Sequence, residues 1–116
     1  MMKRALIEAE QTAIRRVAER LPDIERKQLL DDLMHAVAET VIPDGSRVMF
    51  DIQGYERPLY RGQHSFGVQG ELVDSDGSKL AFDLFADENG RLLELEIVRW
   101  GEGDLRNPDW NSLMLY

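Results

Sequence analysis

The hydrophobic pattern of this chain changes its period once, near Gly45, and that change restricts the fold more than any other feature. Before Gly45, apolar residues recur every three or four positions, as they do in amphipathic helices. After Gly45, apolar and polar residues alternate, as they do in strands with one buried face. Helices followed by a run of strands predict an α+β fold rather than alternating strand and helix units.

Two helices are expected in the first part of the chain, over about residues 3–20 and 24–40. The break at Pro22 is short, so the two helices should form an antiparallel pair. The second helix should end at a turn around Pro43. The predicted buried positions are Leu6, Ala9, Ala13, Val17 and Leu21 in the first helix, and Leu30, Leu33, Met34, Val37 and Val41 in the second.

Four strands are expected after the helices, and hairpin-length turns should make them an antiparallel meander. The turns are Asp74–Gly77 and Asp87–Gly90. The predicted strands cover about residues 48–52, 66–73, 79–85 and 92–100. The expected organisation is one domain, residues 1–116, with a helical part (1–43), a sheet (44–100) and an irregular C-terminal tail (101–116) that packs back on the body.

The charge is acidic and uneven. Fourteen Lys and Arg residues against twenty-two Asp and Glu residues give a net charge of -8, and residues 44–116 carry -7 of it. This balance argues against a nucleic-acid-binding protein, which needs a basic surface, and favours a basic partner. No apolar run approaches the roughly 20 residues that span a bilayer, so no membrane partner is expected. Glu8 and Glu10 interrupt any signal-peptide core, and cysteine is absent, so a cytoplasmic location is expected.

No catalytic, cofactor or metal site is expected. His35 and His64 lie on different predicted elements without a metal-ligand spacing around them. The Asp74–Gly77 segment begins like a calcium loop, but its glycine comes too early, which favours a plain turn. Glu94 and Glu96 share one strand face about 7 Å apart, a spacing that a hydrolase could use. Charge on a solvated strand face is the favoured interpretation of that pair.

The outer face of the predicted sheet is the candidate interaction surface, because it mixes acidic with apolar and aromatic residues. An equally weighted alternative is that the C-terminal tail covers its apolar groups. The expected partner-binding residues are Glu71, Asp83, Glu94, Glu96 and Trp100, together with Tyr55 and Tyr60 from the loop after the first strand.

The stretch from Gly70 to Trp100 resembles small immunity proteins of contact-dependent growth inhibition systems and related domains of polymorphic-toxin loci. The similarity lies in a turn, Val73-Asp74-Ser75-Asp76-Gly77, and in a later strand, Gly90-Arg91-Leu92-Leu93-Glu94-Leu95-Glu96-Ile97. The resemblance implies a non-enzymatic inhibitor that binds the toxic C-terminal domain of an exoprotein in the cytosol. It carries over no catalytic or contact residues.

The sequence and the resemblance together predict a cytoplasmic immunity protein that is a monomer or weak homodimer. Its partner would be a cognate toxin domain, basic and nuclease-like, because nucleases need cationic surfaces to hold phosphates. One alternative is a small ligand-binding or enzymatic α+β domain that uses the space between helices and sheet. Another is a homodimeric structural module that associates through the Trp100 face.

Overall fold

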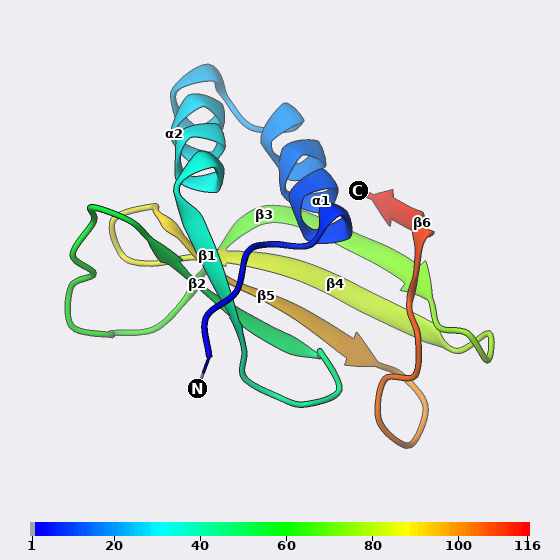
Figure 1. Ribbon diagram of the computed structural model, residues 1–116. Helices are drawn as coiled ribbons and strands as arrows, with labels where there is room; N and C mark the ends of the chain where they lie inside the picture. Colours follow the sequence, from blue (N-terminus) through cyan, green and yellow to red (C-terminus); the bar gives the residue numbers. More distant parts are fainter. Residues whose placement is uncertain (1) are drawn as a thin grey trace.

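The computed structural model describes residues 2–116 and has an α+β fold (Figure 1). Within these residues two helices lie on one face of a six-stranded antiparallel sheet. The helices are α1 (Glu8–Glu19) and α2 (Asp23–Met34), and the strands are β1 (Ala36–Thr40), β2 (Arg47–Ile52), β3 (His64–Val73), β4 (Lys79–Ala86), β5 (Leu92–Arg99) and β6 (Asp109–Leu115). The strand order is β1-β2-β5-β4-β3-β6.

Tight turns join the central strands. The β3–β4 and β4–β5 connections place Gly77 and Gly90 at positive φ values of 86° and 75°, which glycine adopts without strain. β2 then pairs with β5, and β6 pairs with β3, so all pairings among the described strands are antiparallel, as predicted. The predicted meander of four strands is wrong, because β2 lies beside β5 and not beside β3, and only β3, β4 and β5 follow one another as neighbours. The long loop between β2 and β3 carries no hairpin turn, so nothing local fixes β2 next to β3.

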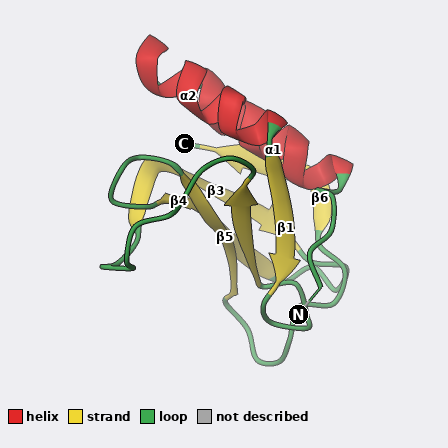
Figure 2. Ribbon diagram, turned by 60° about the vertical axis from the view of Figure 1, so that its left-hand side comes forward, coloured by secondary structure: helices red, strands yellow, loops and turns green. Residues whose placement is uncertain are grey.

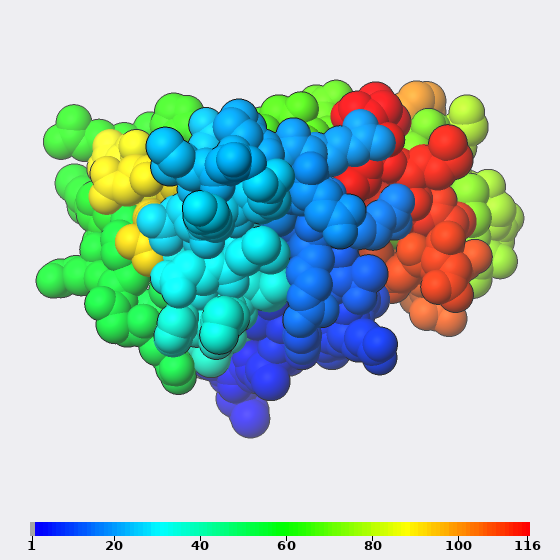
Figure 3. Space-filling view, turned by 90° about the horizontal axis from the view of Figure 1, so that it is seen from above, coloured from blue at the N-terminus to red at the C-terminus, as the bar shows by residue number. Residues whose placement is uncertain are grey.

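The helices run in opposite directions (Figure 1), and both lie over one face of the curled sheet (Figure 2). Seen from above, α1 and α2 lie side by side, with the end of β6 next to α1 (Figure 3). The expected α1 stripe is largely confirmed, because Ala13, Val17 and Leu21 are buried. Glu10 fixes the start of α1 by accepting the Ile7 backbone N–H at 3.0 Å.

The second helix is shorter than the sequence predicts. It ends at Met34 because His35 leaves the helical conformation, with φ −114° and ψ 8°. Residues 36–40 then form β1, which pairs with β2. Leu29 is the buried leucine of α2, and the predicted Leu33 packs against the core. Leu30 and Met34 are exposed, Met34 to 80%, so the predicted buried face of this helix is wrong at these two positions.

The ends of the chain also differ from the prediction. The first helix begins at Glu8, because Arg4 instead exchanges two backbone hydrogen bonds with Ala38 of β1. The tail packs back on the body, as predicted, with Leu105 and Leu113 buried, and it is irregular up to residue 108. Its last part is instead the strand β6, and next to it Tyr116 and Gln69 exchange backbone hydrogen bonds of 2.8 and 3.2 Å. The sheet therefore has six strands rather than four, since both β1 and β6 were missed.

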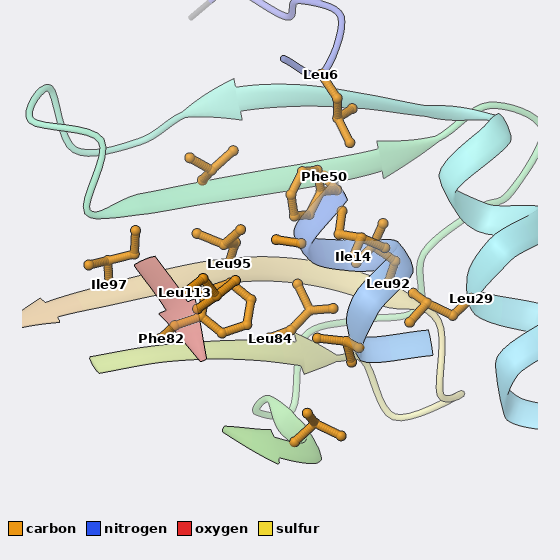
Figure 4. Packing of buried hydrophobic residues seen from close by; sticks show 14 of the residues in the cluster. Leu6, Ile14, Leu29, Phe50, Phe82, Leu84, Leu92, Leu95, Ile97 and Leu113 are labelled. Carbon is orange, nitrogen blue, oxygen red and sulfur yellow. The ribbon is translucent and has the colours of Figure 1, made fainter. Parts of the chain in front are cut away.

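The core lies between the helices and the sheet (Figure 4). Ile14 from α1 and Leu29 from α2 pack among Phe50, Phe82 and Leu95 of the sheet, and all five side chains are at most 1% exposed. Burying a side chain of this size stabilises the fold by about 1.5–3 kcal/mol. Apolar side chains thus occupy the space that a ligand-binding alternative would need.

Candidate interaction surface

The sheet has a second face, opposite the helices, which we call the outer face. Side chains alternate along each strand, so the register places every second residue there. The outer face comprises Arg47 and Met49 of β2; Glu94, Glu96 and Val98 of β5, followed by Trp100; Lys79, Ala81, Asp83 and Phe85 of β4; Gln69 and Glu71 of β3; and Met114 and Tyr116 at the C-terminus.

Large apolar side chains of the outer face are open to solvent. Trp100 is 66% exposed, Val98 51% and Tyr116 63%. The C-terminal tail does not cover them, because Trp110 of β6 packs edge-on against Phe82 in the core, with ring centroids 6.3 Å apart. Within residues 2–116, the alternative of a tail covering this face is therefore wrong for Val98 and Trp100.

Glu94 is fully buried, so its expected place on a solvated face is wrong. Its Oε2 atom accepts a 2.6 Å hydrogen bond from Arg47 Nε, while Oε1 has no hydrogen-bond partner among the described residues. The hydrogen bond and the charge of Glu94 raise the pKa of Arg47 above its ordinary value. The neighbours of Glu94 on the adjacent strands are Met49 and Phe85, whose apolar side chains flank the Glu94 side chain. Glu94 therefore holds Arg47 in place and is not free to meet a partner.

Glu96 and Asp83 stand directly opposite each other on β5 and β4. Asp83 Oδ1 accepts hydrogen bonds from the Ser65 hydroxyl at 2.8 Å and from the Leu84 N–H at 2.9 Å. Neither carboxylate forms an ion pair with any residue between positions 2 and 116. Like charges at directly opposed sheet positions destabilise a sheet. Arg47 stands opposite Glu96 on β2, and the attraction between their charges offsets part of this repulsion.

These two carboxylates line a hollow of about 340 Å³ on the outer face. We call it the acidic hollow. Its other side chains are largely apolar, and they include Ala81, Phe85, Val98, Trp100 and Tyr116. The hollow therefore offers negative charge and an apolar, partly aromatic wall within one small space.

Glu71 and Lys79 lie on the same face beside the hollow. The Lys79 Nζ atom is 3.7 Å from Glu71 Oε1 and 5.7 Å from the centre of the Trp100 ring. Glu71 is thus already paired with a cation, unlike Asp83 and Glu96. The exposed pair adds little stability, since such pairs contribute about 0–1 kcal/mol.

The two loop tyrosines have different surroundings. Tyr60 is 60% exposed and lines a wider cleft of about 770 Å³ that also borders Glu96. Tyr55 instead donates a 2.7 Å hydrogen bond to Asp87, and its ring lies 4.1 Å from the Arg91 guanidinium carbon. Burial and the Asp87 hydrogen bond raise the pKa of Tyr55. Tyr60 is therefore next to the candidate surface, and Tyr55 belongs to a structural network.

The Asp74–Gly77 segment is a turn, as the favoured interpretation predicted. Asp74 is buried and accepts backbone hydrogen bonds from Arg106 at 2.9 Å and Asn107 at 2.7 Å. Burial opposes ionisation of Asp74, but these bonds, the Ser75 N–H and Arg99 outweigh it and lower the pKa. The turn thereby holds the segment before β6 in place. Asp74 and its partners lie about thirty positions apart in the sequence, so no local pattern predicts this contact.

Residues 2–116 contain no cluster of three or more His, Cys, Asp or Glu side chains that could hold a metal ion. Within the same residues, none of the helices has the length and apolar character needed to cross a membrane.

Comparisons with protein-family models, with curated proteins and with solved structures found no match for this chain. The acidic hollow and the exposed aromatic residues around it are therefore the basis for assigning a function.

Proposed function

We propose that this chain is a cytoplasmic immunity protein that neutralises a toxin domain by binding it through the outer face. The observation that carries the proposal is the uncovered sheet face, where Trp100 and Val98 are exposed beside two carboxylates without ion pairs. Exposed aromatic residues flanked by polar groups are typical of protein interfaces. The resemblance to immunity proteins covers Gly70 to Trp100, the part of the chain that contains β4 and β5.

The charge of the chain supports a basic, nuclease-like partner. Residues 44–116 carry a net charge of -7, and they contain every residue that lines the acidic hollow. A surface of one sign increases the rate at which an oppositely charged partner is encountered. Binding that covers a toxin needs no chemistry from this chain, so we assign it no catalytic residue and expect a monomer or weak homodimer in isolation.

The alternatives receive less support. A ligand site between the helices and the sheet would lie where apolar core side chains are packed. A homodimer through the outer face would bring Asp83 and Glu96 of two copies close together, and like charges across an interface oppose association.

The protein encoded directly upstream provides the test. Its C-terminal domain, expressed alone in a bacterial host, should stop growth, and co-expression of this chain should restore growth. Calorimetry on the two purified proteins should show a stable complex. A harmless upstream product, or a toxic one that this chain neither binds nor neutralises, would refute the proposal.

Trp100→Ala should weaken the complex by about 30-fold or more, since central tryptophans contribute about 2 kcal/mol or more to interfaces. Met34→Ala is the matched control, because Met34 is 80% exposed on the opposite, helical side. The control should bind like the wild type. Equal affinities for the two variants would place the interface elsewhere, with the Tyr60 loop as the next candidate.

A further inference from the structure

We infer that the acidic hollow binds one arginine side chain of the protein partner, with the guanidinium group held between Asp83 and Glu96. The inference deepens the proposed function, on which it rests for the identity of the partner as a protein. It follows from two observations, the opposed carboxylates with their energetic consequence and the shape of the hollow.

The charge argument begins with the arginine that is already present. Arg47 stands opposite Glu96 in the register, but its Nε atom bonds to Glu94. Glu96 therefore faces Asp83 without an ion pair, and the charge of Arg47 attracts it only at longer range. Three carboxylates share this single arginine on this part of the face. A further cation in the hollow would meet one carboxylate without an ion pair on each of β4 and β5.

The shape argument concerns the walls of the hollow. Arginine has a long aliphatic stem and a planar head that pairs with carboxylates and stacks on aromatic rings. Ala81 and Val98 are paired across the strands next to the two carboxylates, and Ala81 leaves space for a stem. Trp100 and Tyr116 supply aromatic surface to the same hollow. Its volume of about 340 Å³ is at the lower end for ligand pockets, which suits one side chain.

The energetic argument concerns the interaction between the two carboxylates, apart from the hydrogen bonds that Asp83 accepts from Ser65 and Leu84. Opposed carboxylates on a sheet lower stability, so Asp83 and Glu96 contribute no favourable interaction with each other. A second copy of this chain would bring more negative charge, and a divalent metal ion would need more ligands than the two carboxylates supply. A basic side chain is the occupant that turns the unfavourable pair into a favourable contact.

The test is an NMR titration of the isotope-labelled chain with the peptide acetyl-Gly-Arg-Gly-amide. We expect binding on the order of millimolar, since a single side chain offers few contacts. The shifts should be concentrated at the Trp100 indole N–H and at the amides of Ala81 and Val98. The same peptide with citrulline, which has nearly the same shape but no charge, should cause no such shifts.

The double variant Asp83→Asn/Glu96→Gln should weaken arginine-peptide binding by about tenfold or more. Its thermal stability should equal or exceed that of the wild type, because the repulsion is removed. Glu88→Gln/Glu102→Gln is the control with the same charge change at two exposed positions outside the hollow, and it should bind normally. If the double variant unfolds, the single variant Glu96→Gln replaces it. Its binding of the arginine peptide is then compared with the wild-type titrations with the arginine and citrulline peptides.

Several results would overturn the inference: no shifts at the hollow, equal binding of the citrulline peptide, equal binding of a lysine peptide, or full affinity in the double variant. Failure of the proposed function looks different. A chain that binds the arginine peptide in the hollow but leaves the upstream protein active keeps the arginine site and refutes the immunity role. Neutralisation that survives the double variant keeps the immunity role and refutes the arginine site.

Discussion

Arg47 and Glu94 form an ion pair whose two halves differ in exposure: the Glu94 side chain is 0% exposed and that of Arg47 39%. Arg47→Ala should lower the free energy of unfolding by about 2 kcal/mol, because it leaves a buried carboxylate without its cation. This loss of unfolding free energy is smaller than the loss expected for a fully buried ion pair, because Arg47 is partly exposed to water. Urea denaturation measures the change.

The double variant Arg47→Leu/Glu94→Leu should recover most of this loss, because apolar replacement of a buried pair removes both desolvation costs. Arg15→Ala, at an exposed helix position, is the control and should change stability by less than about 0.5 kcal/mol. Equal effects of Arg47→Ala and Arg15→Ala would show that Glu94 has another partner.

Asp74 should make the stability of the chain depend on pH. Its pKa is lowered in the folded state, so its contribution is complete above the pKa of the unfolded chain, about 3.9, and disappears as the pH falls through the folded value. Asp74→Asn should therefore lower the free energy of unfolding by about 2 kcal/mol at pH 7. The difference from the wild type should shrink below about pH 4.

Urea denaturation at several pH values between 2 and 7 checks this expectation. Asp104→Asn, at an exposed position in the same segment, should show no such dependence on pH. A constant difference between wild type and Asp74→Asn down to acidic pH would contradict the role given to the carboxylate.

At the scale of elements, the sequence predicted the parts whose patterns are local. The strands β2 to β5 and their glycine turns were found because alternation and turn residues are properties of neighbouring positions. β1 was missed because Leu33 and Val37 continue the helical spacing, and only pairing with β2 decides for a strand at residues 36–40. β6 was missed for the same reason: its partner β3 lies about forty positions earlier.

The close approach of β6 to β3 depends on Gly70. A Cβ atom at this position would lie 2.9 Å from Leu115 Cδ2 and 3.1 Å from the Met114 carbonyl oxygen. Gly70→Ala should therefore force the strands apart and lower the free energy of unfolding by about 1–3 kcal/mol. Amide hydrogen exchange at Tyr116 and Gln69 should accelerate, because their mutual hydrogen bonds weaken.

Gly101→Ala is the matched control, since its Cβ would have no neighbour closer than 3.7 Å. It should leave both stability and exchange nearly unchanged. A Gly70→Ala variant as stable as this control would show that β6 shifts without cost.

At the scale of the whole molecule, the sequence located the candidate surface but not the role of each residue. The alternation of residues placed Glu94 and Glu96 on one face of the sheet. Only the folded chain shows that Arg47 and apolar neighbours enclose Glu94, while Glu96 forms no ion pair. Trp100 was predicted either exposed or covered, and the path of β6 decides for exposure. Burial depends on which strands are neighbours, and the local pattern does not contain that information.

The net charge of -8 should make association with a basic toxin domain depend on salt. Glu96→Lys should slow association, with the largest effect at low ionic strength, because it reverses a charge at the acidic hollow. Stopped-flow kinetics at two salt concentrations measure this effect. Glu88→Lys, an equal charge change in the β4–β5 turn, should slow association less, and equal slowing would show that only the total charge matters.

Each edge strand of the sheet is partly covered by another part of the chain. Arg4 exchanges backbone hydrogen bonds with Ala38 along β1, and the Arg20 side chain donates to the Leu115 carbonyl of β6 at 3.0 Å. Free strand borders are templates on which further chains add and grow into fibrils, and short or covered borders prevent this. Growth of the sheet by addition of further chains is therefore opposed at both of its edges.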